Sequence, residues 1–154
     1  MPIDQAALKK QMEGNRRLTV RTIEAFPAHE LFSYAPAKEL RPFAEMVIEI
    51  LHMEWGYMRG IARQEWVFEE PYATVETKEG LLRACTEQNK KIEGYWAAIP
   101  EERLMEVEQD PFWGGPQSHY DRLFYSLENE IHHRGQGFVY LRMLGMEPPA
   151  FYER

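Results

Sequence analysis

Apolar residues recur every three or four positions along four long segments of the chain. This spacing places them on one face of an α-helix, so it predicts amphipathic helices rather than strands. Proline and glycine set the breaks between the segments. Four helices of about 20 to 26 residues, each about 30 to 39 Å long, predict an all-α four-helix bundle. The predicted helices cover residues 4–26, 41–63, 78–98 and 119–144.

Three connections join these helices, and the first, residues 28–37, contains Pro36. Residues 64–75 are irregular and aromatic-rich, and residues 101–118, which contain Asp110-Pro111 and Gly114-Gly115-Pro116, are predicted to form a loop. A connection as long as the last one often replaces the short turns of an up-down-up-down bundle. The aromatic residues outside the helices would either line a pocket mouth or a dimer surface, or pack the connections onto the bundle, and packing is the favoured interpretation. They are Trp66, Phe68, Tyr72, Trp113, Phe151 and Tyr152.

Composition narrows the class of protein. A length of 154 residues favours one domain, taken as residues 1–154. The net charge of −7 argues against a nucleic-acid-binding surface, which is normally basic. The cluster of Arg16, Arg17 and Arg21 is accordingly predicted to lie on a solvated helix face.

The single cysteine, Cys85, excludes an intramolecular disulfide and fits a reducing compartment. We predict that it is buried as a small apolar residue. No apolar stretch approaches the roughly 18 to 20 residues that a membrane span needs. We therefore expect a cytoplasmic protein that binds neither nucleic acid nor a membrane.

The second predicted helix carries a carboxylate in an unexpected place. At 100° per residue, Glu54 falls in the middle of the apolar arc. An unpaired carboxylate there would be costly, so we expect a buried hydrogen-bonding or ionic partner and a structural role. The polar arc of the same helix contains Glu45, Glu49, His52, Gly56, Arg59 and Arg63.

The fourth predicted helix has two distinct stripes. Asn129 and His133 stand one turn apart, so their side chains can converge on a single point. Their stripe is either a pocket wall or a solvated face, and spacing alone favours the solvated face. It comprises Tyr125, Asn129, His133, Gln136 and Tyr140, whereas the other stripe comprises Leu123, Phe124, Leu127, Ile131, Gly135 and Phe138.

Two Glu-x-x-His spacings offer a further possibility. Glu49 with His52, and Glu130 with His133, match the arrangement that di-iron bundles place on two of their four helices. Such a site also needs a glutamate from each of the other two helices. The pattern is short and glutamate is abundant, so a ferritin-like di-iron protein is the least favoured hypothesis.

The carboxyl-terminal part of the chain has a specific motif, His132-His133-Arg134-Gly135-Gln136, followed by Val139-Tyr140-Leu141-Arg142-Met143-Leu144-Gly145. With Glu54 and Arg59-Gly60-Ile61 on the second helix and Asn15-Arg16-Arg17 on the first, the chain resembles the DinB/YfiT-like superfamily. The resemblance implies a four-helix bundle, often with up-up-down-down connections and frequently a homodimer. It also implies a divalent metal ion, commonly nickel or zinc, held by one histidine of helix two and a His-x-x-x-His pair of helix four. Some relatives are transferases or isomerases that use low-molecular-weight thiols.

The chain departs from this family pattern at the implied metal site. His133 matches the second histidine of the pair, but Asn129 stands in place of the first. On helix two, alignment through Glu54 puts Glu49 at the family histidine, while His52 stands one turn later. The candidate metal ligands are therefore Glu49, His52, Asn129 and His133, a mixed set that is expected to bind more weakly than three imidazoles.

Two functional hypotheses follow from these residues. The leading one is a DinB-like protein with a metal pocket between helices two and four, acting as a thiol-dependent transferase or a metal-dependent hydrolase. In it, Tyr125 or Gln136 would orient a substrate. The alternative is a non-catalytic dimeric bundle whose metal site has decayed, which the presence of Asn129 motivates.

Overall fold

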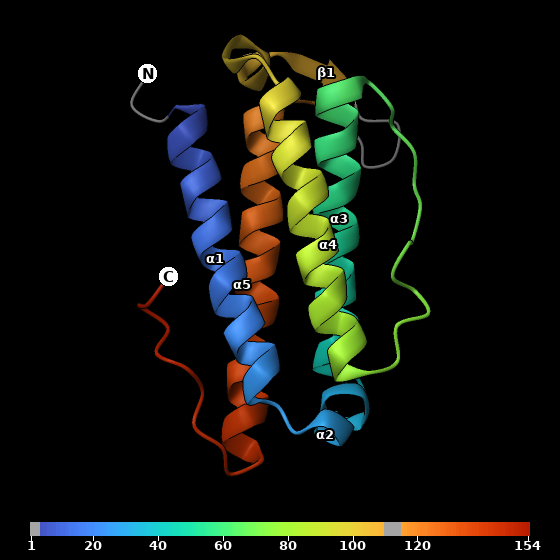
Figure 1. Cartoon of the computed structure of the whole chain (residues 1–154), viewed down its shortest axis with the longest axis vertical. Helices are drawn as coiled ribbons and strands as arrows, with labels where there is room; N and C mark the ends of the chain where they lie inside the picture. Colours follow the sequence, from blue (N-terminus) through green and yellow to red (C-terminus); the bar gives the residue numbers. More distant parts are fainter. Residues whose placement is uncertain (1–3, 110–114) are drawn as a thin grey trace.

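Four long helices form the body of the molecule (Figure 1). The computed structural model describes residues 4–109 and 115–154. The four long helices begin and end within two residues of the predicted limits, so the all-α bundle is confirmed. The helices are α1 (Gln5–Ala25), the short α2 (Ala28–Ser33), α3 (Phe43–Arg63), α4 (Lys78–Ala98) and α5 (His119–Met143). Within the described ranges, no helix is long and apolar enough to cross a membrane.

Local side chains fix the helix ends. The hydroxyl or carboxylate of a capping residue accepts a hydrogen bond from a first-turn amide at the start of three helices: Asp4 from Ala7 (2.7 Å), Thr77 from Gly80 (3.0 Å) and Ser118 from Asp121 (3.0 Å). At the end of α3, Gln64 adopts a left-handed backbone conformation (φ 57°) and its amide donates to the carbonyl of Gly60.

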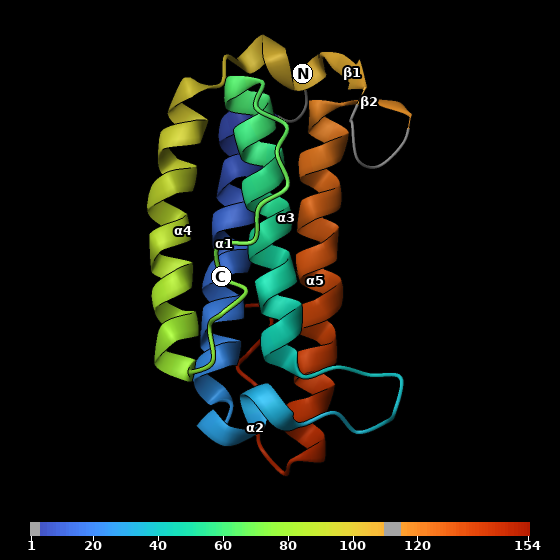
Figure 2. The same cartoon turned by 90° about the vertical axis from the view of Figure 1, so that its right-hand side faces the viewer.

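The long helices run up, down, down and up in chain order. Figures 1 and 2 show α1 antiparallel to α3, α4 parallel to α3, and α5 antiparallel to α4. The expected up-up-down-down order is thus not confirmed. The crossover is the connection between α3 and α4, whose 14 residues (64–77) return along the length of the bundle. Fourteen extended residues reach about 46 Å, more than the roughly 32 Å of a 21-residue helix, so this segment is long enough for the return.

The connection between α4 and α5 has structure that the sequence did not predict. Expected to be a loop, it contains a 3₁₀ helix, η1 (Glu101–Met105), and a small antiparallel hairpin of β1 (Val107–Gln109) and β2 (Pro116–Ser118). The hairpin pairs Val107 with Ser118 and Gln109 with Pro116. The Asp110-Pro111 break and Trp113 lie outside the described residues.

The core consists of two apolar clusters, one toward each end of the bundle. α1 and α3 each pack against both α4 and α5. One cluster surrounds Phe43 and Leu51 and includes Cys85, which is buried as predicted, and the other surrounds Met58 and Leu123. Burial raises the pKa of the Cys85 thiol to about 11, so the thiol stays protonated at neutral pH.

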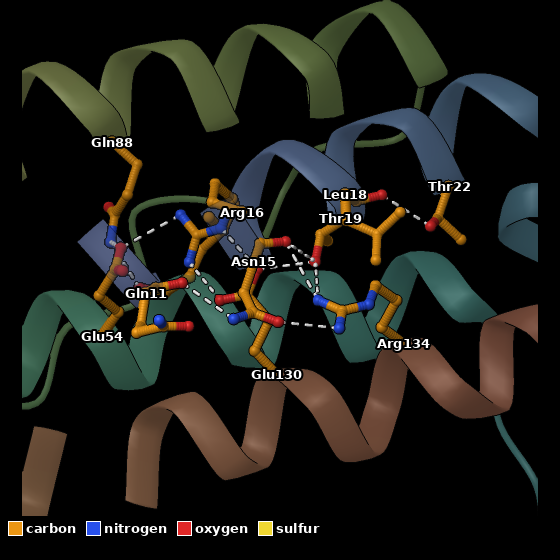
Figure 3. A network of polar contacts seen from close by, with 11 residues as sticks. Gln11, Asn15, Arg16, Leu18, Thr19, Thr22, Glu54, Gln88, Glu130 and Arg134 are labelled. Atoms are coloured by element: carbon orange, nitrogen blue, oxygen red, sulfur yellow. Dashed lines mark hydrogen bonds and ion pairs between the residues drawn. The ribbon is translucent and has the colours of Figure 1, made fainter. Parts of the chain in front are cut away.

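A layer of buried polar side chains from all four long helices separates the two clusters (Figure 3). Arg16 is only 3% exposed, and its guanidinium donates to both carboxylate oxygens of Glu130 (2.9 and 3.2 Å) and to Glu54 (3.1 Å). Gln88 also donates to Glu54 (3.1 Å), and Thr19 donates to Glu130 (2.7 Å). The buried partner expected for Glu54 is confirmed, whereas the prediction of a solvated Arg16 is wrong.

A second arginine extends the layer along α1. Arg134, 5% exposed, donates to the side-chain oxygen of Asn15 (2.9 Å) and to its backbone carbonyl (3.1 Å). Burial lowers the pKa of Arg134 to about 10. The layer thus contains two arginines and two glutamates, so its formal charges balance inside the bundle.

Candidate functional site

The α3–α5 seam brings two of the four predicted metal ligands together. The Glu49 carboxylate Oε2 and the His133 imidazole Nε2 are in direct contact. The guanidinium of Arg41, just before α3, lies 3.0 Å from the same Glu49 oxygen and 3.5 Å from His133 Nε2. A carboxylate, an imidazole and a guanidinium therefore meet at one point.

His133 is oriented by its own helix. The residue is 9% exposed, and its Nδ1 lies 3.3 Å from the side-chain oxygen of Gln136, one turn further along α5. This geometry fits an Nδ1–H that donates to Gln136, a tautomer assigned from the contact. Nε2 faces Glu49, and a ring nitrogen in contact with a carboxylate oxygen shares either a proton or a cation with it. The Arg41 guanidinium is the cation that lies within 3.5 Å of both groups.

His52 lies away from this cluster. Its Nε2 accepts a hydrogen bond from the backbone amide of Tyr72 (3.1 Å), and its ring stacks on the Tyr72 ring with centroids 5.6 Å apart. Burial lowers the pKa of His52, although Glu70 acts to raise it. The lone pair of Nε2 is therefore engaged by the crossover segment, and the structure does not bring His52 together with Glu49 and His133.

Asn129 keeps an unused polar atom. Its Nδ2 is buried and has no hydrogen-bond partner in the part of the chain that the structure describes. It stands one helical turn before His133, on the same stripe of α5. A buried polar atom without a partner is uncommon and points to a group that the protein atoms alone do not supply.

An open cavity of about 560 Å³ adjoins the cluster. Its walls come from α3 and the crossover, and they combine carboxylates with apolar side chains. Phe68, predicted to pack a connection, is 59% exposed here, whereas Tyr72 is buried as that interpretation expected. The cavity is large enough for a small organic molecule. Its lining residues are Arg41, Glu45, Ile48, Glu49, His52, Met53, Phe68, Glu70 and Ala73.

Comparison with known proteins places this architecture in a family. A model of the DinB family matches residues 1–154. The chain belongs to the DinB family. Among solved structures, this DinB-family chain is similar to a DinB-like protein from Bacillus cereus ATCC 10987, with a TM-score of 0.77, 16% sequence identity, and coverage of 96% of this chain and 97% of that one. It is also similar to a DinB-like protein from Bacillus subtilis, with a TM-score of 0.75, 24% identity, and the same coverage of 96% and 97%. At these identities the likeness demonstrates the fold alone. No curated protein matches the sequence.

The residues of this DinB-family chain fit a divalent metal ion only in part. Glu49 Oε2 and His133 Nε2 already converge, and a ligating histidine normally donates its second ring N–H, as His133 does to Gln136. The unpartnered atom of Asn129 is Nδ2, an N–H donor that seeks an acceptor, so a metal ion would have to be held by the side-chain oxygen of Asn129 instead. However, residues 4–109 and 115–154 contain no cluster of three His, Cys, Asp or Glu side chains suited to a metal. Glu130, needed for the di-iron hypothesis, is instead engaged by Arg16.

Sequence reasoning missed Arg41 altogether. It precedes Pro42 in a connection, and nothing local indicates that its side chain reaches Glu49, eight positions later, and His133 on another helix. Spacing alone also predicts that the stripe of α5 that carries His133 is solvated. Both His133 and Tyr140 are instead buried, and the Tyr140 hydroxyl donates to the carbonyl of Arg41 (2.9 Å).

Proposed function

We propose that this DinB-family protein binds a divalent metal ion at Glu49 and His133, with the side-chain oxygen of Asn129 as a third ligand, and acts on a small molecule in the adjoining cavity. The observation that carries the proposal is the convergence of the Glu49 carboxylate and the His133 imidazole from two helices. Oxygen and nitrogen donors of this kind suit zinc or nickel. His52, engaged by Tyr72, is left outside the donor set.

The reaction class proposed is transfer to or from a low-molecular-weight thiol, or hydrolysis. A bound divalent ion would supply the acidity that deprotonates a thiol or a water molecule. The protein's own contribution would be to hold the reacting group beside a fixed carboxylate and imidazole, with Gln136 keeping the His133 ring in place. Met53 and Phe68 offer apolar surface for the remainder of the substrate.

A non-catalytic bundle with a decayed metal site is the second candidate. The observation that favours it is the position of Arg41, whose guanidinium places a permanent positive charge beside Glu49 and His133. In this alternative Arg41 replaces the metal ion, and the cluster serves as a salt bridge between the connection, α3 and α5. Asn129 in place of a histidine agrees with it.

The first test is the metal content of the untagged wild-type protein after incubation with zinc or nickel and removal of unbound metal. We expect about one metal ion per chain under the proposal, and its loss in Glu49→Gln and in His133→Ala. His29→Ala is the matched control, because His29 is exposed on α2. A wild type without metal would refute the proposal, and gain of metal by Asn129→His with Arg41→Met would then establish the decayed site.

A further inference from the structure

A second cavity opens between α1 and α4, away from the contact between Glu49 and His133. Its volume is about 410 Å³, enough for a small organic molecule. α1 and α4 supply most of its lining, and Glu54 of α3 also lines it. Glu54 follows Glu49 by five positions on α3, which turns its side chain by about 140° around the helix. The cavity is therefore separate from the candidate metal site.

Glu54 brings a carboxylate oxygen without a hydrogen bond to this cavity. Its Oε1 accepts from Arg16 Nη1 and from Gln88 Nε2, both at 3.1 Å (Figure 3). Its Oε2 accepts from no residue in the ranges 4–109 and 115–154. The residue is 4% exposed, and an oxygen without a donor is uncommon in a side chain buried to that extent. The open oxygen calls for a hydrogen-bond donor from outside the chain.

The charge around Glu54 favours a positively charged donor. Arg16 donates two of its three hydrogen bonds to Glu130 and one to Glu54, so a single guanidinium serves two carboxylates. Burial raises the pKa of Glu54, and Arg16 opposes that shift without abolishing it. A second positive charge beside Oε2 would stabilise the ionised carboxylate further.

The rim of the cavity leaves this preference unchanged. Two carboxylates lie there, Glu13 and Glu93, and Lys9 pairs with both at 3.5 and 2.8 Å. Arg17, also at the rim, is exposed to solvent. These two acidic and two basic side chains balance, so the floor of the cavity decides the charge of the ligand.

Trp96 adds a donor to the same cavity. Its side chain lines the cavity and is 5% exposed, yet its indole N–H donates to no residue that the structure describes. A buried indole N–H normally has an acceptor, so this group calls for an oxygen atom on the ligand. Met12 and Ile92, both buried, offer apolar surface beside it.

We propose that the cavity between α1 and α4 binds a small amino alcohol. Its ammonium group donates to Oε2 of Glu54, its hydroxyl oxygen accepts from the indole N–H of Trp96, and its apolar part lies against Met12 and Ile92. A hydrogen bond from an ammonium to a carboxylate is about twice as strong as one between neutral groups. The site needs no metal ion, so it is independent of the function proposed for Glu49 and His133.

Three probes of similar shape test the chemistry of the ligand. Phenylalaninol carries both groups, and its titration is followed by backbone amide NMR shifts in the presence of EDTA. We expect saturation with a dissociation constant of about 1 mM or tighter and shifts along α1 and α4. With 3-phenylpropane-1,2-diol, a hydroxyl replaces the ammonium, so binding should be at least about tenfold weaker. Phenethylamine lacks the hydroxyl and should bind at least about threefold more weakly. Equal affinity for either analogue would overturn the assignment to an amino alcohol.

The variant Glu54→Gln changes the oxygen that faces the ligand. Its amide oxygen can still accept from Arg16 and Gln88, while an NH₂ group replaces Oε2. It should weaken the binding of phenylalaninol at least about tenfold, with the helical circular dichroism retained. Glu70→Gln is the matched control in the cavity beside the candidate metal site and should leave binding unchanged. Loss of binding in Glu70→Gln but not in Glu54→Gln would overturn the proposal.

A blocking variant keeps the test independent of the polar layer. Asn89 is an exposed lining residue on α4, so Asn89→Trp should fill the mouth of the cavity and abolish binding. Lys90→Trp makes a similar change at the next exposed position, which does not line the cavity, and should bind as the wild type does. Equal binding by Asn89→Trp and the wild type would overturn the site. So would a wild type that shows no saturable shifts up to about 10 mM phenylalaninol.

Discussion

Arg16 offers the sharpest test of how the bundle is held together. The substitution Arg16→Met keeps much of the length and apolar stem of the side chain but removes the guanidinium. Three hydrogen bonds are lost, two to Glu130 and one to Glu54. Both carboxylates are at most 4% exposed, so neither can recover the lost contact from water without opening the bundle.

The expected cost follows from this burial. Breaking a buried ion pair by removing one partner typically costs about 3 to 5 kcal/mol, because it leaves an uncompensated charge in the interior. Domains have total stabilities of about 5 to 15 kcal/mol, so Arg16→Met should remove at least about a fifth of the stability of a domain. For a chain of this size the midpoint of thermal unfolding should fall by about 6 to 20 °C.

Urea unfolding, followed by circular dichroism, measures this loss. The slope of the unfolding free energy against urea concentration should remain that of the wild type. The triple variant Arg16→Met/Glu54→Gln/Glu130→Gln removes the charges together, while its amides still accept from Gln88 and Thr19, so it should recover more than half of the loss. Stability of the single variant should also depend on pH. Burial raises the pKa of Glu54 and Arg16 opposes that shift, so without Arg16 the loss should be smaller at pH 5 than at about pH 8.

An unfolding free energy within about 1 kcal/mol of the wild type would refute this account of the layer. A triple variant as unstable as Arg16→Met would show instead that lost packing, rather than unpaired charge, causes the effect. Glu13→Met is the matched surface control, since Glu13 is exposed on the same helix and forms only a surface pair with Lys9 (3.5 Å). It should change the stability by about 0.5 kcal/mol at most.

Three further predictions concern the site and its supports. Arg41→Met should tighten zinc binding at least about tenfold, equal to about 1.4 kcal/mol, because it removes a competing cation from Glu49 and His133. Equilibrium dialysis measures this affinity, and an unchanged value would contradict the prediction. Burial lowers the pKa of His52 below its unfolded value. The stability that the neutral ring contributes is therefore present above about pH 6.5 and is lost as the pH falls toward the folded pKa. In urea titrations between about pH 7 and 5.5, His52→Gln should consequently lose less stability than the wild type. Gly137→Ala should destabilise the fold by about 1 to 3 kcal/mol, because the new methyl group would collide with Phe43. In the control Gly94→Ala, the new methyl group meets nothing within 4 Å, so this variant should be more stable than the wild type by up to about 1 kcal/mol. Similar thermal midpoints for the two variants would refute the argument.

The helices were predictable because their causes are local. Apolar periodicity, capping residues such as Thr77 and Ser118, and breaks such as Pro100 act within a few positions, and they fixed the helix ends to within two residues. The order of the helices depends instead on which connection spans the bundle. The connections after α3 and after α4 are both long. The packing of Tyr72 against α3 and α4 shows that the connection after α3, residues 64–77, is the one that spans the bundle.

The polar layer and the candidate site were only partly predictable, because their contacts join residues that lie far apart in the chain. Glu54 could be identified because a carboxylate in an apolar arc needs a partner. Arg16 lies on the same face of the first helix as Met12 and Thr19, and this spacing was the signal that could have indicated its burial. The charge of Arg16 favoured a solvated position instead. Its partners lie 38 and 114 positions away in the chain, and no local pattern brings them together.

The separation between Arg16 and Glu130 also constrains the order of events during protein synthesis. α1 precedes α4 and α5 in the chain but packs against both of them. Until residue 130 has emerged from the ribosome, Arg16 lacks the carboxylate that accepts two of its hydrogen bonds, and the face of α1 that packs against α5 has no neighbour. A nascent chain or a truncated product that stops before α5 therefore cannot close the bundle, and it exposes apolar helix faces to chaperones and proteases. Closure of the bundle therefore waits for the residues of α5.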